Sequence, residues 1–458
     1  MTFWTSDRVH DALRPLARLN LPRGSQPFAR VWTDTRTIAS GDLFVALAGE
    51  RFDAHDFLEQ AVASGAAGVV VSNVDKARGL GVPVFEVSDT LVALGALGHY
   101  RRCVWGRPVI AVVGTNGKTS TKELLKAALG STLETHATHG NLNNLVGVPL
   151  TLLATPDGAD IAVVEMGTNQ PGEVARLRAI VEPNVTVVTS IAEEHLEGLG
   201  DLAGVMREEL AACEGVATAV VPSFQPDVVA EARRRARHVL AAGLESGDLR
   251  AEGWELEADG RGRVIVDGVE VRVPLRGVHN LRNTMLALGV ARLVGVPTER
   301  AAHGIDAMPV PPMRSNVEQI GGATLVNDAY NANPGSARAA LELLEHAGRG
   351  RQRVAILGTM LELGPGGPGL HEALARDALA SPIEIVAGVG QFAVALDRVA
   401  DGQSRQRLVT ADDVESLWNR LSSRLAPDAV ILLKASRGVR LEQLVPKIRE
   451  WAAGGVRS

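Results

Sequence analysis

Residues 109–120 read VIAVVGTNGKTS, and this stretch decides the fold. Five consecutive apolar residues, 109–113, are typical of a strand buried on both faces of a parallel sheet. A glycine-containing turn follows, and a helical pattern comes directly after it. Because backbone N–H groups at such a turn and the dipole of the next helix favour negative charge, the stretch predicts a phosphate-binding loop. The residues of this loop are Gly114, Thr115, Asn116, Gly117, Lys118, Thr119 and Ser120.

The loop departs from the common pattern G-x-x-x-x-G-K-[ST] at one position, since Val112 stands where the first glycine would be. The match is the shorter form T-x-G-K-T. In that form Lys118 would reach the β- and γ-phosphates of a nucleotide, and the Thr119 hydroxyl would bind Mg²⁺. The alternative is a strand-to-helix turn whose glycines serve geometry alone.

Length and composition indicate a soluble chain of several domains. The 458 residues correspond to two to four domains, with three as the central expectation. A net charge of -6 argues against a nucleic-acid partner, although one local pocket can still bind a small anion. Acidic residues near the N-terminus and the lack of a long apolar run predict a cytoplasmic protein without a membrane span. Cys103 and Cys213 are expected to be small buried thiols, with no disulfide and no cysteine-based metal site.

Apolar runs alternate with helical patterns along the whole chain, which predicts an α/β fold with mostly parallel sheets. Asp267-Gly268 between two alternating runs predicts a type I′ hairpin, an antiparallel patch at the edge of the second domain. The proline-rich residues 308–313 are expected to form a linker. Strands are expected at 42–47, 68–72, 82–87, 109–113, 161–164, 185–188, 219–221, 324–326, 354–357, 383–387 and 429–433, and helices at 57–64 and 122–129. The expected domains are 1–106, 107–310 and 311–458.

Acidic and imidazole side chains follow the strands of the second domain. Glu165 comes directly after one expected strand, and His195 follows the next by a short loop. Ligands of open α/β sheets bind at the carboxyl ends of strands, and Mg²⁺ prefers oxygen ligands. Each position also has a plainer interpretation: a solvated glutamate, a structural histidine, and, for Glu208 and Glu209, a solvated helix face.

Four further segments carry a resemblance to a known family. They are THGNLNN (138–144), HLEG (195–198), NDAYNANPGS (327–336) and LGTMLELG (357–364), the last followed by His371. Together with the phosphate loop, they resemble the Mur ligase family, which builds the peptide of the bacterial cell-wall precursor. The resemblance covers essentially the whole chain. It implies an N-terminal UDP-binding domain, a central ATPase domain and a C-terminal Rossmann-like domain.

Within this family, the segments are similar to those of the member that joins D-alanyl-D-alanine to UDP-N-acetylmuramoyl-tripeptide. The resemblance therefore implies an ATP- and Mg²⁺-dependent amide ligase that acts through an acyl phosphate in peptidoglycan precursor synthesis. We expect it to work as a monomer. No D-N-P-R block, which marks the tripeptide-forming member, is present. The third residue of the tripeptide, diaminopimelate or lysine, stays open.

The resemblance also implies roles for single positions. Catalysis is expected from Lys118, Arg314 and His195, and ATP binding from the phosphate loop with His279, Asn280, Asn283, Arg314 and Asp328. Substrate contacts are expected from Thr35, Arg36, Asn141, Asn143, Asn144, Tyr330, Asn331 and Lys434. The expected metal ligands are Thr119, Glu165, His195 and Glu209.

Glu209 is a departure from the family pattern, since many members have a carbamylated lysine there. A glutamate has the same negative charge, so Glu209, or Glu208 if the register shifts by one, would support a second Mg²⁺ unmodified. Three rival functions remain at this point: another amide ligase of the superfamily, such as a folylpolyglutamate synthetase, a nucleotide-operated switch or motor, and a catalytically silent binding protein.

Overall fold

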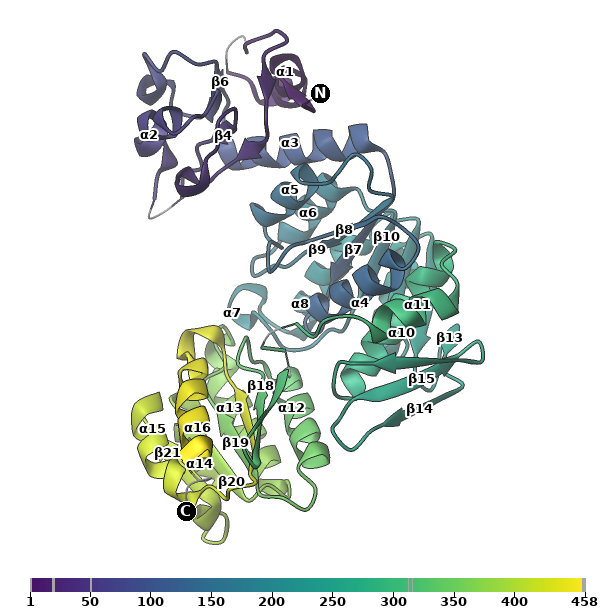
Figure 1. Cartoon of the computed structure of the whole chain (residues 1–458), viewed down its shortest axis with the longest axis vertical. Helices are drawn as coiled ribbons and strands as arrows, with labels where there is room; N and C mark the ends of the chain where they lie inside the picture. The colour runs from purple at the N-terminus through teal and green to yellow at the C-terminus, as the bar shows by residue number, and fades with distance from the viewer. Residues whose placement is uncertain (1, 19–20, 50–51, 312, 315, 455–458) are drawn as a thin grey trace. The chain divides into compact units, whose positions relative to one another are not determined.

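The computed structural model describes residues 2–18, 21–49, 52–311, 313–314 and 316–454 (Figure 1). The chain divides into two compact units. Unit 1 comprises residues 1–111, 133–168 and 172–184, and unit 2 comprises 112–132, 169–171 and 185–458. The division passes through strand β7 (Val109–Val113), which leads into the phosphate loop.

The N-terminal part of unit 1 is a parallel sheet with strand order β3-β4-β5-β6. Alternation along the pleat gives it two cores: Leu43 and Val45 pack with Phe28 and Phe85, while Phe44 packs on the opposite face. The strands are β3 (Val31–Trp32), β4 (Leu43–Val45), β5 (Gly68–Val71) and β6 (Val84–Glu86), with an antiparallel pair β1 (Trp4–Thr5) and β2 (Pro27–Phe28). The helices are α1 (Ser6–Leu13), α2 (Leu58–Ala63) and α3 (Thr90–Trp105).

The rest of unit 1 packs against α3. Strands β8 (Thr135–Ala137) and β9 (Ile161–Glu165) are parallel, and α5 (Gly147–Leu153) and α6 (Glu173–Val181) both contact α3. Gly98 allows the α3–α5 approach, because a Cβ at this position would lie 2.9 Å from the Pro149 Cα.

Unit 2 begins with the helix α4 (Lys118–Gly130) and continues with four parallel strands in the order β10-β11-β12-β13. The strands are β10 (Val185–Val188), β11 (Thr218–Pro222), β12 (His238–Gly243) and β13 (Leu249–Arg250). The helices are α7 (Leu196–Leu199), α8 (Leu202–Glu209), α9 (Pro226–Arg235), α10 (Val278–Leu293) and α11 (Thr298–Asp306). Helix α10 packs on α4, on β11 and on β12, and most of its side chains are buried.

The predicted hairpin is present and forms the expected antiparallel patch. Asp267 and Gly268 have φ angles of 53° and 72°, as a type I′ turn requires. Its strands join one more to form a separate three-stranded antiparallel sheet, rather than extending the edge of the parallel sheet. The strands are β14 (Gly253–Leu256), β15 (Gly262–Val266) and β16 (Val269–Val273).

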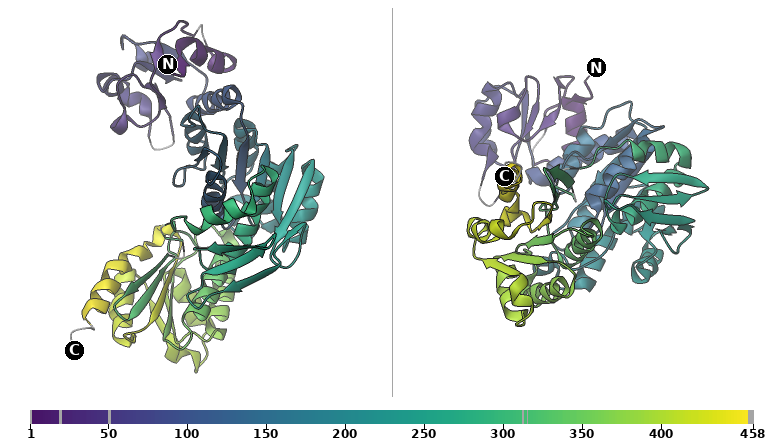
Figure 2. Two further views of the ribbon diagram at one scale, coloured as in Figure 1. Left: turned by 45° about the vertical axis from the view of Figure 1, so that its right-hand side comes forward. Right: turned by 60° about the horizontal axis from the view of Figure 1, so that its bottom comes forward.

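The C-terminal part of unit 2 is a six-stranded sheet with helices on both faces (Figures 1 and 2). The order is β17-β18-β22-β19-β20-β21; β17 and β18 are antiparallel and the other neighbours are parallel. The strands are β17 (Asn316–Ile320), β18 (Ala323–Asn327), β19 (Arg353–Leu357), β20 (Ile385–Val389), β21 (Leu408–Ala411) and β22 (Val430–Lys434). Helices α12 (Pro334–Ala347), α13 (Gly367–Ala380) and α14 (Gln391–Val399) cover one face, and α15 (Val414–Leu421) and α16 (Leu444–Gly454) cover the other.

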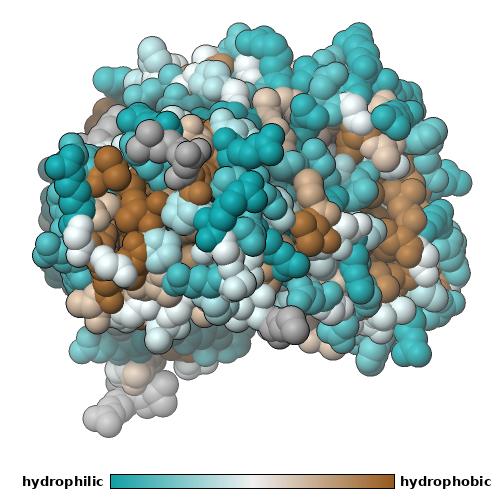
Figure 3. All heavy atoms as spheres, turned by 90° about the horizontal axis from the view of Figure 1, so that it is seen from above, coloured by the Kyte–Doolittle hydropathy of each residue, from teal (hydrophilic) through white to brown (hydrophobic). Residues whose placement is uncertain are grey.

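Two expectations need correction. Cys103, near the C-terminal end of α3, is exposed, so only Cys213 is the expected buried thiol. The strand expected from Ile383 begins at Ile385. Of the expected linker, Pro312 lies outside the described residues. None of the helices in the described ranges is both long and apolar enough to cross a membrane, and the face in Figure 3 is mostly hydrophilic with separate apolar areas.

Candidate functional site

The phosphate loop is held by close backbone packing in unit 2. Gly114 and Gly117 have φ angles of 117° and 87°, where glycine is favoured. A Cβ on Gly114 would lie 2.5 Å from the Thr189 Oγ1, so the loop can approach the end of β10 only without a side chain. The Thr115 N–H donates to the Ser190 carbonyl at 2.7 Å. The sequence prediction of a strand–loop–helix is confirmed, since α4 begins at Lys118 directly after this turn.

Two buried carboxylates lie close to the loop. The Gly114 N–H donates to the Glu209 Oε2 at 2.8 Å. Burial raises the pKa of Glu209, against the opposing effects of Lys118 and of this N–H. The Lys118 Nζ lies 3.9 Å from the Glu194 Oε2 and donates to the Gly114 and Thr115 carbonyls at 2.5 and 3.1 Å. Glu209 therefore lies beside the lysine of the loop, whose positive charge favours the ionised carboxylate.

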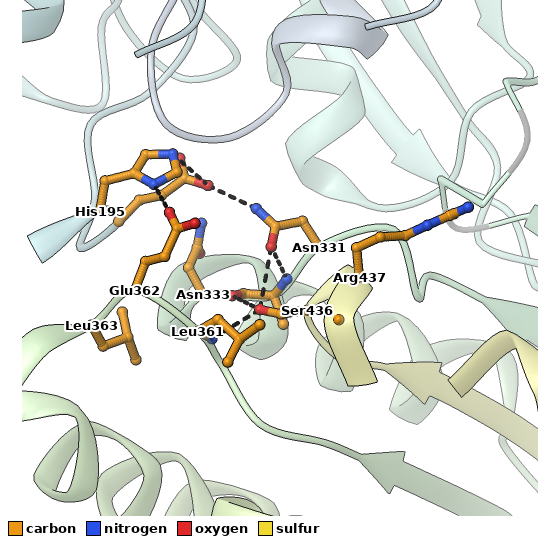
Figure 4. A pocket seen from close by; sticks show the side chains of 11 residues that line it. His195, Asn331, Asn333, Leu361, Glu362, Leu363, Ser436 and Arg437 are labelled. Atoms are coloured by element: carbon orange, nitrogen blue, oxygen red, sulfur yellow. Dashed lines mark hydrogen bonds and ion pairs between the residues drawn. The ribbon is translucent and has the colours of Figure 1, made fainter. Parts of the chain in front are cut away.

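His195 stands at the start of α7 in a left-handed conformation, with φ of 52°. Its Nδ1 pairs with the Glu362 carboxylate, and its Nε2 lies 3.9 Å from the Glu194 Oε1 (Figure 4). Glu362 follows β19 and also has a positive φ, 62°. Two left-handed non-glycine residues in contact indicate a local backbone held in place by its surroundings.

A cavity of about 550 Å³ opens beside the loop. Its walls include Asn116, Gly117 and Ser120 from the loop, His279, Asn280 and Asn283 from α10, and Arg314, Asp328 and Lys434. Every one of these residues except Lys434 was predicted to bind ATP, and Lys434 was predicted to bind substrate. The Asp328 carboxylate accepts a hydrogen bond from the Lys434 Nζ at 2.6 Å. The residue predicted to bind ATP and the residue predicted to bind substrate therefore form one ion pair.

Burial lowers the pKa of His279 to about 4, so the imidazole is neutral at pH 7. The Asn280 amide lies 3.1 Å from its Nε2. A neutral ring beside an amide suits an uncharged aromatic ligand group more than an anion.

The cavity also has residues that the sequence did not single out. Phe224 and Trp254 are aromatic and about 40% exposed, and the Arg282 guanidinium lies 4.5 Å from the Phe224 ring centre. Gln225 makes two hydrogen bonds with the Ile191 backbone, at 2.7 and 2.9 Å. Phe224 lies in the turn after β11 and Trp254 lies in β14, and a single aromatic residue in either place leaves no periodic signal, so only the fold reveals them.

A second pocket of about 200 Å³ lies between the loop after β10 and the ends of β18, β19 and β22 (Figure 4). The Asn331 amide donates to the Glu194 Oε1 at 3.0 Å, and the Ser436 hydroxyl donates to the Asn331 Oδ1 at 3.3 Å. Arg437 lines the same pocket.

Three contacts connect the C-terminal part to the phosphate loop. Asn116 and Asn333 exchange amide hydrogen bonds at 2.8 and 3.2 Å. The Arg314 Nη2 donates to the Thr119 Oγ1 at 3.3 Å, and its guanidinium stacks on the Tyr330 ring at 4.0 Å. Tyr330 therefore lies against Arg314, a neighbour that the sequence did not predict.

The remaining predicted residues belong to unit 1. Glu165 is the last residue of β9, and its Oε1 accepts from the Asn143 amide at 2.9 Å. Asn144 accepts from the Val146 and Gly147 N–H groups just before and at the start of α5, while Asn141 is exposed. Arg36 follows Thr35 in a single 3₁₀ turn (Thr35–Thr37).

The Arg36 guanidinium bonds to Asp34 and lowers the pKa of that carboxyl to about 2. Arg36 itself is 83% exposed, so it can turn to a ligand at little cost.

Sequence and structure comparisons identify the chain's relatives. The "Mur ligase family, catalytic domain" matches residues 28–102, the "Mur ligase middle domain" 112–291, and the "Mur ligase, glutamate ligase domain" 313–437. The UDP-N-acetylmuramoyl-tripeptide–D-alanyl-D-alanine ligase of Bacillus subtilis is 32% identical over 92% of this chain and 93% of that protein. The chain belongs to the Mur ligase family.

Solved structures of the family agree with this assignment. A MurF from Acinetobacter baumannii superposes with a TM-score of 0.87 at 31% identity, covering 98% of this chain and 99% of that one. The MurF ligase of Thermotoga maritima in complex with ADP has a TM-score of 0.80 at 26% identity, covering 93% of this chain and 98% of that one. The predicted α/β fold and the family resemblance are therefore confirmed.

Proposed function

We propose that this Mur ligase joins D-alanyl-D-alanine to the terminal carboxylate of UDP-N-acetylmuramoyl-tripeptide, consuming ATP in peptidoglycan precursor synthesis. The observation that carries the proposal is the meeting of the phosphate loop with residues 327–336. Asn333 bonds to Asn116 of the loop, and Asn331 bonds to Glu194, which lies 3.9 Å from Lys118. The names of relatives matched over nine-tenths of the chain support the substrates.

The chemistry needs activation because oxide is a poor leaving group from a carboxylate. A tripeptide carboxylate oxygen attacks the γ-phosphorus of ATP, ADP leaves, and an acyl phosphate forms. The dipeptide amine then attacks the acyl carbon, phosphate leaves, and the amine loses a proton. Positioning and charge neutralisation dominate phosphoryl transfer, so we assign Lys118 and Arg314 to the transferred phosphate.

ATP is proposed to occupy the 550 Å³ cavity. The phosphate loop would hold its phosphates, the neutral His279 with Asn280 and Asn283 would face the adenine, and Asp328 would face the ribose. Phe224 and Trp254 add aromatic surface to the same cavity.

Mg²⁺ fits the donors that lie near the loop. Thr119, Glu194 and Glu209 offer oxygen atoms, which Mg²⁺ prefers, and His195 offers one nitrogen. Glu209, buried beside Lys118, is proposed to act in place of a carbamylated lysine. Glu165 of unit 1 is a further proposed ligand. The ion would neutralise phosphate charge.

The proposal also covers the residues that bind the substrates, the domain boundaries, the oligomeric state and the location of the enzyme. Thr35 and Arg36 are assigned to the UDP group. Asn141, Asn143, Asn144, Tyr330, Asn331 and Lys434 are assigned to the peptide substrates. We propose domains at 1–106, 107–310 and 311–458, a monomeric state and a cytoplasmic location; the three family matches, which fall within these ranges, support the domains.

The test measures phosphate release from ATP and Mg²⁺ with D-alanyl-D-alanine and each of two tripeptides, ending in diaminopimelate or lysine, together and separately. We expect release only with both substrates, and a product heavier by the dipeptide less water. Lys118→Ala should lower release by about 10³-fold. Lys126→Ala, at an exposed lysine of the same helix, should leave release nearly unchanged. Release with a folate and glutamate instead would show that the chain is an amide ligase with other substrates than those proposed. Failure to release phosphate with any acceptor would refute the ligase function.

A further inference from the structure

A group of three potential metal ligands lies in unit 1, apart from every residue assigned to the ligase site. His99 and Cys103 are four residues apart on α3, so they lie on the same face of the helix. Glu182 ends α6, which packs on α3. Each of the three offers one ligand atom, and these atoms all lie within 4.8 Å of one another.

Two of the three separations between ligand atoms are close to those across a tetrahedral metal ion, and the third, between the Cys103 Sγ and the Glu182 carboxylate, is within 4.8 Å. The Cys103 Sγ lies 3.4 Å from the His99 Nε2, which lies 3.8 Å from the Glu182 Oε1. Zinc bonds of about 2.3 Å to sulfur and about 2.0–2.2 Å to nitrogen or oxygen, at tetrahedral angles, place neighbouring ligand atoms about 3.5 Å apart. One ion can therefore reach all three atoms with small side-chain movements.

The hydrogen bonding of His99 leaves its Nε2 available to bind the metal. Its Nδ1 lies 3.1 Å from the Ile180 carbonyl oxygen, which can only accept, so the proton of the neutral ring is on Nδ1. The lone pair of Nε2 then points toward Cys103 and Glu182. A backbone carbonyl that holds the second ring nitrogen is the usual support of a zinc-bound histidine.

The two helices form a close and fixed framework. A Cβ on Gly95 would lie 2.9 Å from the Ile180 Cδ1, so the glycine permits the close approach of α3 to α6. The Arg102 guanidinium donates to the Val181 and Glu182 carbonyls at 3.0 and 3.1 Å. These bonds hold the end of α6, where Glu182 adopts a left-handed φ of 42°.

We propose that His99, Cys103 and Glu182 bind one divalent cation of the zinc class, with water as the fourth ligand, and so fasten α6 to α3. A soft thiolate and an imidazole select such an ion over Mg²⁺, which keeps this site chemically distinct from the proposed ATP site. Binding displaces the proton of the Cys103 thiol, because the thiolate is the form that binds the metal.

Cobalt(II) titration of the full-length protein tests the proposal, because a thiolate bound to cobalt gives a charge-transfer absorption in the near ultraviolet. The titration is made with excess Mg²⁺ and ADP. We expect one equivalent of cobalt per chain to produce the band and zinc to remove it. Cys103→Ser should abolish the band, while Cys213→Ser, the matched control at the buried cysteine, should keep it.

Variants of the other two ligands distinguish a three-ligand metal site from a single cysteine that binds cobalt alone. His99→Gln and Glu182→Gln should each weaken cobalt binding at least ~10-fold, the lower limit seen even for groups that only support a ligand. The thermal midpoint should rise with zinc in the parent protein and not in Cys103→Ser. A band that is absent, that survives both substitutions unchanged, or that follows Cys213 would overturn the proposal. Phosphate release by these variants should equal that of the parent, so failure here leaves the proposed ligase function intact.

Discussion

Gly117→Ala tests whether the phosphate loop and α10 act as one binding surface. The φ angle of Gly117 is 87°, a conformation that L side chains rarely adopt. An added Cβ would lie 2.7 Å from the Asn283 Nδ2 and 2.9 Å from its Oδ1. The methyl group therefore strains the loop and displaces the amide that is proposed to face the adenine.

The magnitude follows from these two effects. A left-handed conformation costs a non-glycine residue about 1–2 kcal/mol. The displaced Asn283 loses its hydrogen bond to the Asn280 Oδ1, 3.2 Å long, which contributes about 1 kcal/mol. We expect the free energy of unfolding to fall by about 2–3 kcal/mol. ADP affinity should fall at least ~10-fold, which corresponds to about 1.4 kcal/mol at the nucleotide site.

The assay compares Gly117→Ala with Gly130→Ala, at the other end of α4. A Cβ at Gly130 meets nothing within 4 Å, so this control should keep ADP affinity and lose no stability. Urea unfolding gives the free energies, and calorimetric titration with ADP gives the affinities. If Gly117→Ala bound ADP as tightly as Gly130→Ala, the reasoning that joins the loop to α10 would be refuted.

Three further changes test other parts of the site. Lys118→Ala should lower kcat for phosphate release by about 10³-fold, the loss typical of a group that stabilises developing charge, against little change for Lys126→Ala. The lowered pKa of His279 means that the unfolded chain binds a proton between pH 6.5 and about 4 that the folded chain does not; stability should therefore fall as the pH drops through this range, and His279→Gln should remove that part of the pH dependence in urea unfolding. The effect is at most about 3 kcal/mol, because the ring remains partly exposed to the cavity. Asp328→Asn should destabilise the fold by about 3 kcal/mol by leaving the buried Lys434 without its carboxylate, and adding Lys434→Met should restore part of the loss; equal stability of the two variants would contradict the ion pair's role.

The parts of this structure that the sequence predicts are those with local causes. The apolar run 109–113 and the following glycine turn give β7 and the start of α4 without reference to any other segment. The Asp267-Gly268 turn likewise determines its hairpin. Whether that hairpin extends a sheet or joins a separate one depends on packing partners distant in the chain, so the sequence predicted the antiparallel patch but not its third strand, β14.

Side-chain partners that come from distant segments could not be predicted. His195 was selected for its place after a strand, but its contact with Glu362 joins residues 167 positions apart. Cys103 was expected to be buried because small thiols usually are. The continuation of α3 to Trp105 instead places it on an exposed side of the helix. Both outcomes depend on tertiary packing, which a single sequence does not display.

Asn333 shows how one residue connects fold and chemistry. Its Oδ1 accepts from the Ser336 N–H at 2.8 Å and so caps α12, while its amide exchanges hydrogen bonds with Asn116 of the phosphate loop. Aspartate would serve the cap equally well, but it has no amide hydrogen to donate to the Asn116 Oδ1. The helix start alone therefore does not explain asparagine at this position. The contact with the loop does, and it makes the start of α12 part of the proposed ATP site.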